Sequence, residues 1–190
     1  MDSILNSQLA PDKICPQQLP PYRVGFGEDL HVLRQEKPAI FENIPDFFGL
    51  RLGGVLINTP LWTVVAHSDG DVLLHALTDA LLGAAGAGDI GDHFPDTDEK
   101  NRGRNSTDFV RFALHLLEQT GYKPLHVDTV VFLQAPRLTP YKSSIKNSIA
   151  DILGINPLNV NIKAKSGEGV DAVGTGLAIR ATAVVIAGLV

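Results

Sequence analysis

The stretch 66–84, AHSDGDVLLHALTDALLGA, decides how this chain folds. Good helix formers run without interruption over 72–82, and Gly83 follows them as a stop signal. Ser68 and Asp71 have the spacing of a capping box, so we expect Ser68 to cap this helix. The stretch therefore predicts a buried, mostly apolar helix around which the remaining elements pack.

One polar side chain, His75, interrupts this apolar helix. Asp71 and Asp79 lie one turn away on either side, so one of them could orient the imidazole. Asp29 and His31, two residues apart at the end of a predicted strand, point to the same face of that strand. A solvated Asp-x-His pair and a buried histidine bonded to an aspartate are the ordinary alternatives. Together the three residues would form a zinc site that leaves one coordination position open.

The elements outside this helix predict an α+β fold with a mixed four-stranded sheet and helices packed on one face. A second helix should run from near Asn105 to Gly121, and a third from Thr139 to Gly154. The sheet face away from the helices is expected to be more polar, or to meet another subunit. Strand-like segments lie at 22–30, 51–57, 125–133, 158–165 and 178–186, and a long loop at 34–50.

Length and composition limit the functional classes. The 190 residues suffice for one domain, which we place at 22–190 after a loosely ordered extension at 1–21. A net charge of −5 argues against nucleic acid or an anionic membrane surface as partner. The apolar C-terminal stretch 178–190 contains Arg180 and is too short to span a bilayer. Cys15 is the only cysteine, so a reducing compartment is expected.

Three further segments carry polar groups that are weak signals individually. His67 precedes the N-terminus of the first helix, where a phosphate would be favoured. The acidic loop 89–98 is either a solvated turn or a site for the hydroxyl groups of a polyol. The turn 163–169 is either a plain glycine turn or an anion site, and Glu168 suits a phosphate only with a bridging divalent cation.

Taken together, these segments resemble the 2-C-methyl-D-erythritol 2,4-cyclodiphosphate synthase family. The resemblance rests on GFGEDLH (25–31), the stretch 66–84, GDIGDHFPDTD (88–98), QAP (134–136) and NIKAKSGE (161–168). It implies a homotrimer with active sites between subunits. It also implies one zinc ion per active site on Asp29, His31 and His75, and magnesium or manganese held by Glu168 between the substrate phosphates.

The resemblance also assigns roles to the remaining site residues. His67 and Ser166 would act on the transition state. The substrate would be bound by Ser68 and Asp98, by the erythritol-binding residues Asp89, Ile90, Gly91, Phe94, Pro95 and Asp96, and by the cytidine-binding residues Leu133, Gln134, Ala135, Pro136, Arg137, Leu138, Thr139, Ala164 and Lys165.

Three features depart from the family pattern. Phe26 stands where many members have histidine near the metal, and the connection 34–50 is longer than usual. Ala172 and Thr175 replace the Phe and Arg of many bacterial members, which puts in doubt isoprenoid diphosphate binding in the trimer channel but not the catalysis.

The implied activity converts 4-diphosphocytidyl-2-C-methyl-D-erythritol 2-phosphate to the 2,4-cyclodiphosphate and CMP, in non-mevalonate isoprenoid biosynthesis. The compartment would be the bacterial cytoplasm, or the plastid stroma in a plastid-bearing organism. Two rivals remain: a zinc-dependent phosphohydrolase of a nucleoside diphosphate derivative, and a cytidine-nucleotide binding module without catalysis. The products separate the first rival from cyclisation, because a hydrolase incorporates solvent oxygen.

Overall fold

The computed structural model describes residues 19–34, 49–57 and 63–190. Most of the extension predicted at 1–21, and of the loop predicted at 34–50, lies outside these residues. Within them, no helix is long and apolar enough to cross a bilayer.

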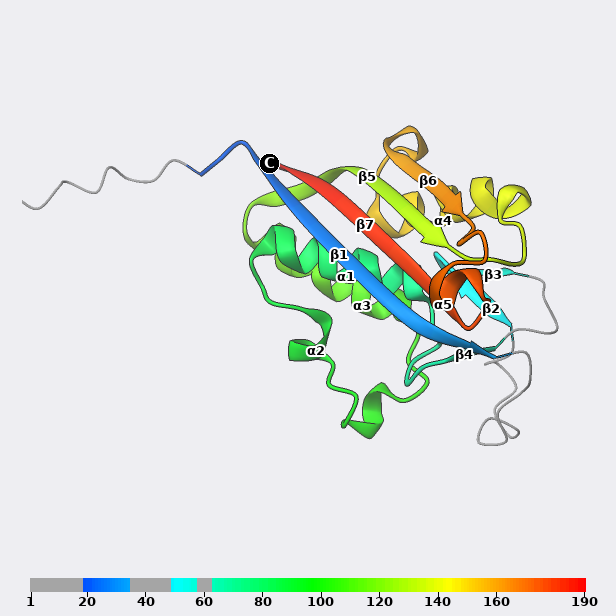
Figure 1. Cartoon of the computed structure of the whole chain (residues 1–190). Coiled ribbons are helices and arrows are strands. Elements are labelled where there is room, and N and C mark those ends of the chain that lie inside the picture. The colour runs from blue at the N-terminus through cyan, green and yellow to red at the C-terminus, as the bar shows by residue number, and fades with distance from the viewer. Residues whose placement is uncertain (1–18, 35–48, 58–62) are drawn as a thin grey trace, which may run out of the picture.

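A five-stranded sheet forms the centre of the molecule (Figure 1). Only β5 and β6 pair in parallel, so the sheet is mixed, as predicted. The predicted count of four strands is wrong, because a three-residue strand, β4, adds to one edge. The spatial order is β4 (Thr63–Val65), β1 (Tyr22–Arg34), β7 (Ala178–Leu189), β5 (Tyr122–Phe132) and β6 (Val160–Lys165).

The segment 51–57 is a hairpin rather than the strand that we predicted. Strands β2 (Leu50–Leu52) and β3 (Val55–Ile57) pair with each other in a separate two-stranded sheet. Gly53 and Gly54 connect them, with φ of +61° and +81°. Both values lie in the left-handed region that a tight two-residue hairpin turn requires, and glycine adopts it without strain.

Helices α1, α3 and α4 pack on one face of the five-stranded sheet (Figure 1). The first runs past Gly83, where we had expected it to stop, and ends at Gly86, whose φ is +72°. The cap predicted at Ser68 is also wrong, because the Asp71 side chain caps α1 by accepting a hydrogen bond from Leu74 N. The helix bounds are α1 Val72–Ala85, α2 Ile90–His93, α3 Ser106–Gln119, α4 Lys142–Leu153 and α5 Asp171–Gly174, and the 3-10 helices are η3 Glu99–Asn101, η4 Thr139–Tyr141 and η5 Pro157–Asn159.

Two glycines of β1 let α1 lie directly against this strand. A Cβ at Gly25 would overlap the carbonyl oxygen of Ala80, and a Cβ at Gly27 would overlap that of Ala76. Ala76 and Ala80 are one turn apart, so small residues from both elements form the contact. The close approach brings His75 of α1 next to the C-terminal half of β1.

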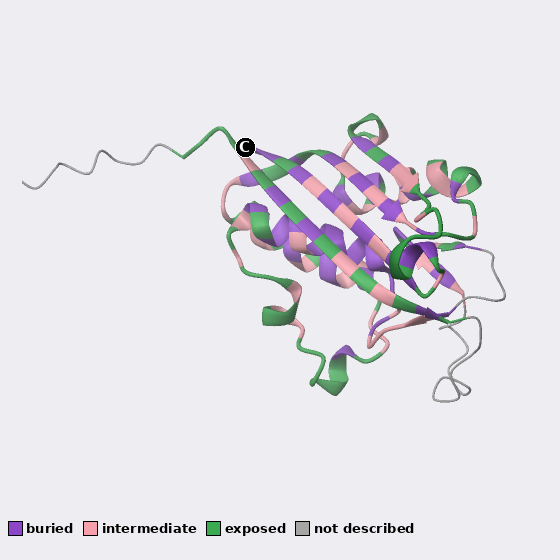
Figure 2. Cartoon of the chain, in the orientation of Figure 1, coloured by how far each residue is buried: buried purple, intermediate pink, exposed green. Residues whose placement is uncertain are grey.

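On the other face of the sheet, the side chains of β1 are exposed and mostly apolar. Buried and exposed residues alternate along β1 (Figure 2), as expected for a strand with one covered face. The uncovered side chains include Val24 and Phe26, which are 66% and 61% exposed, and also Leu30 and Val32. Phe26 therefore points to the opposite strand face from Asp29 and His31, and the expected position of its side chain near these two predicted ligands is wrong.

Candidate metal centre and adjoining pockets

Asp29, His31 and His75 converge as the sequence predicted. The carboxylate oxygen Oδ2 of Asp29 lies 2.9 Å from His75 Nδ1 and 3.1 Å from His31 Nε2. The two ring nitrogens are 3.2 Å apart. Both β1 residues have odd numbers, so they share the strand face that is turned toward α1.

The spacing and the donor set fit a zinc ion. Zinc with bonds of about 2.0–2.2 Å in tetrahedral geometry has ligand atoms roughly 3.3–3.5 Å apart. The three measured distances fall slightly below that range, so a small outward movement would admit the ion. Two imidazole nitrogens and one carboxylate oxygen are ligands that zinc commonly takes.

The three groups strongly influence one another's protonation. Burial opposes the charge on Asp29, but hydrogen bonding and positive charge from His75 and His31 outweigh it and lower the pKa of Asp29. Burial lowers the pKa of His31 despite the nearby Asp29 carboxylate. For His75, burial is outweighed by the hydrogen bond and charge of Asp29, and the pKa is raised. Asp29 therefore favours the protonated form of His75 more than water would.

The imidazole of His75 is oriented by residues that the sequence analysis did not single out for this role. Its Nε2 atom lies 2.9 Å from Ser68 Oγ and 3.0 Å from Ser106 Oγ. The Phe109 ring packs against it, with 5.7 Å between ring centroids. The predicted partners are engaged elsewhere, since Asp71 binds the backbone N–H groups of 53 and 54, and Asp79 binds that of Ile90.

A cavity of about 500 Å³ opens beside the three ligands. Asn101 and Phe109 also line it, and neither was predicted. Asp89 and Asp98 are not among the lining residues; their side chains cap α2 and η3. The predicted site residues that the structure brings together here are Asp29, His31, His67, Ser68, His75, Ile90, Gly91, Phe94, Pro95 and Asp96.

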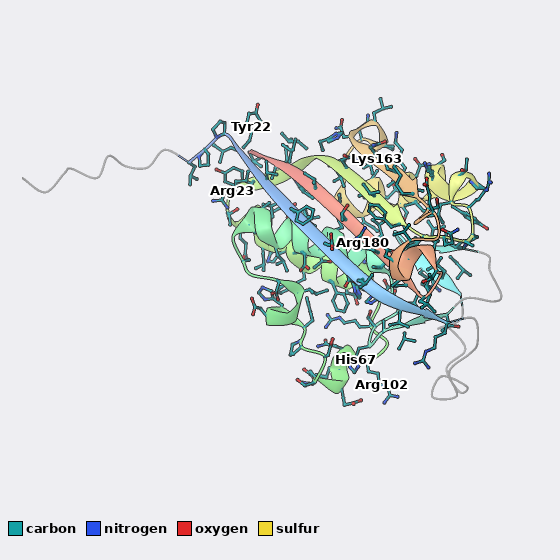
Figure 3. All side chains as sticks on the ribbon, viewed as in Figure 1. Tyr22, Arg23, His67, Arg102, Lys163 and Arg180 are labelled. Carbon is teal, nitrogen blue, oxygen red and sulfur yellow. The ribbon has the colours of Figure 1, made fainter. Side chains whose placement is uncertain are left out.

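His67 presents an unpaired nitrogen in this region. Its Nε2 atom is buried and has no hydrogen-bond partner among the described residues. The backbone of the same loop is fixed by two hydrogen bonds to the segment before α3: Gly103 N donates to His67 O, and Asp69 N donates to Arg104 O, at 2.8 and 3.1 Å. Figure 3 shows His67 and Arg102 on these neighbouring loops at one end of the molecule.

A second cavity, of about 340 Å³, lies at the ends of β5 and β6. The predicted residues Ala135 and Glu168 do not line it; Ala135 precedes Pro136 through a cis peptide bond, and Glu168 lies in the following turn with φ of +50°. No described residue lines both cavities. The predicted residues that line this cavity are Leu133, Gln134, Pro136, Arg137, Leu138, Thr139, Ala164, Lys165 and Ser166.

The model of the YgbB family matches residues 22–187, which include both cavities and all three proposed zinc ligands. The chain belongs to the YgbB family.

Named relatives agree with this assignment. The chain is 43% identical over 171 residues to 2-C-methyl-D-erythritol 2,4-cyclodiphosphate synthase of Rhodopirellula baltica, covering 90% of this chain and 95% of the relative. It is 40% identical to the chloroplastic synthase of Catharanthus roseus, covering 91% of this chain and 68% of that protein. A solved 2C-methyl-D-erythritol-2,4-cyclodiphosphate synthase in its CDP-bound form is 39% identical, with a TM-score of 0.73 over 86% of this chain and 98% of that structure.

Proposed function

We propose that this chain is a metal-dependent cyclase that converts 4-diphosphocytidyl-2-C-methyl-D-erythritol 2-phosphate to 2-C-methyl-D-erythritol 2,4-cyclodiphosphate and CMP. The observation that carries the proposal is the convergence of Asp29, His31 and His75 beside a polar cavity in a member of this family. The sequence identity of this chain to relatives named as this synthase supports the reaction. The CDP-bound structure of a relative supports a cytidine nucleotide as ligand.

The reaction is intramolecular. An oxygen of the 2-phosphate forms a bond to the β-phosphorus, and the bond from that phosphorus to the oxygen of the departing CMP breaks. Such phosphoryl transfer depends on alignment and on charge neutralisation rather than on a protein nucleophile. Asp29, His31 and His75 would hold a zinc ion, which would supply positive charge to offset the repulsion between the two phosphates.

The residues of the chain hold the substrate around this centre. We assign the wall formed by Ile90, Gly91 and 94–96 to the erythritol moiety, with Asp89 at the start of the same segment. Ser68 lines the cavity and Asp98 follows this wall in the sequence, and we assign both to substrate binding. We assign a transition-state role to His67, because it lines the cavity and its buried Nε2 atom has no hydrogen-bond partner among the described residues. The second cavity, with Lys165 and Arg137 as cationic groups, suits the cytidine diphosphate portion, and Ser166 lies at its edge.

The second cation is assigned to Glu168. Glu168 is exposed and lies two residues after Ser166, which lines the second cavity. Magnesium or manganese bound by the Glu168 carboxylate would therefore be close to the substrate phosphates. Glu168→Gln should retain zinc but require much more magnesium or manganese for turnover. An unchanged cation requirement would remove Glu168 from this role.

A homotrimer with shared active sites accounts for two features. The first cavity lies beside β1, and the second lies at the ends of β5 and β6, which are two and three strands away in the sheet, or about 10–14 Å at the usual strand spacing. The uncovered sheet face is apolar over β1, as expected of a subunit interface. We assign the metal centre and the cytidine site of one active site to neighbouring subunits.

The compartment follows the source of the chain. The relatives include a bacterial and a chloroplastic synthase, so we propose the bacterial cytoplasm, or the plastid stroma in a plastid-bearing organism.

The deciding experiment is product analysis with the purified chain in ¹⁸O-labelled water. We expect CMP and a cyclic diphosphate, neither carrying the label. Labelled phosphate products would instead establish the phosphohydrolase, and CDP binding without turnover would establish the nucleotide-binding module.

His75→Ala tests the metal centre in the same assay. We expect loss of zinc and of CMP release with the fold retained, while His115→Ala, at an exposed histidine of α3, should change neither. Near-normal turnover by metal-depleted His75→Ala protein would defeat the proposal.

A further inference from the structure

The nitrogen of His75 that faces away from the proposed metal lies in a buried hydroxyl cluster. Ser68 Oγ and Ser106 Oγ are 2.9 and 3.0 Å from His75 Nε2, and Ser106 is fully buried. Ser106 is the first residue of α3, and it lies 31 positions from His75 in the sequence. Contact between α1 and α3 brings the two side chains together.

The Asp69 carboxylate fixes the direction of the bond between Ser106 and His75. Asp69 Oδ2 accepts a hydrogen bond of 3.1 Å from Ser106 N, and Asp69 Oδ1 accepts one from the Ser106 hydroxyl. An ionised carboxylate only accepts hydrogen bonds, and a serine hydroxyl has a single proton to donate. The Ser106 proton is therefore directed to Asp69, so Ser106 Oγ offers a lone pair to His75 Nε2.

Ser68 does not impose a direction in this way. Its Oγ accepts a hydrogen bond of 3.2 Å from Gly70 N, and the structure gives its hydroxyl proton no carboxylate acceptor among the described residues. The Ser68 hydroxyl can therefore donate to His75 or accept from it. Asp69 and Ser106 therefore set which atoms donate and which accept in the hydrogen bonds of this cluster.

We propose that Ser106, held by Asp69, is a positioning residue that fixes His75 with its proton on Nε2. This arrangement leaves the Nδ1 lone pair facing the ligand atoms of Asp29 and His31. The inference rests on the zinc site of the proposed function. Partners of this kind hold the tautomer and the ring orientation of a metal-bound histidine, and their loss typically weakens metal binding about 10–100-fold.

The test is the zinc affinity of the full chain with Ser106→Ala, measured by competition with a chelator. We expect binding weaker by about 10–100-fold. Alanine keeps the backbone N–H that Asp69 also binds, so α3 should remain anchored. The matched control is Thr78→Val, which removes a buried hydroxyl of α1 that donates to Leu74 O and is not among the hydrogen-bond partners of His75 in the described residues. Its zinc affinity should match that of the wild type.

Two further measurements separate positioning from a general structural effect. If Asp69 acts through the Ser106 hydroxyl, Asp69→Asn and Ser106→Ala should be strongly non-additive, with the double variant binding zinc about as tightly as the weaker single variant. In ¹⁵N-histidine spectra of the zinc-loaded chain, the Nε2 proton of His75 should exchange with solvent faster in Ser106→Ala than in wild type or Thr78→Val.

Wild-type zinc affinity in Ser106→Ala, or full additivity with Asp69→Asn, would overturn the inference while leaving the proposed cyclase intact. A wild-type chain that binds no zinc would overturn both the metal site and this inference. A chain that binds zinc through the Ser106-dependent site but releases labelled hydrolysis products would overturn only the proposed reaction.

Discussion

Asp71 links two elements through one carboxylate. Its oxygens accept hydrogen bonds from Gly53 N, Gly54 N and Leu74 N, at 2.9, 2.6 and 3.0 Å. It therefore caps α1 and also holds the turn of the β2–β3 hairpin against that helix. Asp71 is completely buried, so water cannot replace it.

Asp71→Ala should destabilise the fold by about 2–4 kcal/mol, because it removes a cap and leaves buried N–H groups without an acceptor. Urea unfolding would measure the change. The control is Asn105→Ala, which removes a single exposed cap bond to Thr107 N and should cost only about 1 kcal/mol. Equal losses in the two variants would contradict the double role of Asp71.

Zinc affinity should depend on pH through His75. The proton on His75 competes with zinc for Nδ1, and the pKa of His75 lies above the usual 6.5. As the pH is lowered, zinc affinity should therefore begin to fall while the pH is still above 6.5. In the metal-free protein, the stability of the fold depends on the same proton. The contribution of His75 to the free energy of unfolding is fully present below pH 6.5 and is lost as the pH rises through the raised pKa. Chelator competition across a pH series would check this, and constant affinity down to pH 6 would contradict it.

At this scale the sequence predicted the ligands but not the groups that orient them. Asp29 and His31 follow from the two-residue period of a strand, and His75 from its place in an apolar helix. Ser106 gave no signal, because a serine at a helix start usually has only a local role. The spacing of Ser68 and Asp71 resembled a capping box, yet the Ser68 hydroxyl is turned toward His75 instead.

Among the elements, the contact between α1 and β1 determines how close His75 lies to Asp29 and His31. Gly25 and Gly27 place the strand backbone against Ala76 and Ala80, and the ligands lie just beyond this contact. A bulkier residue on β1 would displace the helix that carries His75.

Gly27→Ala should therefore weaken zinc binding and destabilise the protein by about 1–3 kcal/mol, because the added methyl group overlaps the Ala76 carbonyl. The control is Glu28→Ala, the neighbouring position on the exposed face of β1, which should leave zinc affinity unchanged. Chelator competition and urea unfolding would measure both. A Gly27→Ala variant with normal zinc affinity would show that α1 can shift without disturbing the ligands.

Long elements were predictable and short ones were not. The helix near 72–82 shows as a long run of good helix formers, and those near 105–121 and 139–154 show apolar periodicity and end signals; the structure contains all three. Strand β4 has only three residues, too few to show alternation, and the segment 51–57, predicted as one strand, forms most of a hairpin whose two strands have three residues each. The ends of short strands are decided by pairing with distant segments, which local sequence does not contain.

For the whole molecule, the uncovered sheet face predicts self-association. Phe26→Asp places a charge among exposed apolar residues of β1 and should convert a trimer to a monomer, measured by light scattering after size exclusion. The monomer should still bind zinc but lose CMP release if, as we propose, each active site combines residues of neighbouring subunits. The control is Leu158→Asp, at an 81% exposed residue of η5, which should remain trimeric. A fully active monomer would contradict the shared site.

The two backbone hydrogen bonds between the loop at His67 and the segment before α3 have a kinetic consequence. They tie the segment before α3 to the loop that carries His67, although both segments are irregular. These loops should therefore open together or not at all, and substrate entry would depend on one concerted motion rather than on two independent ones.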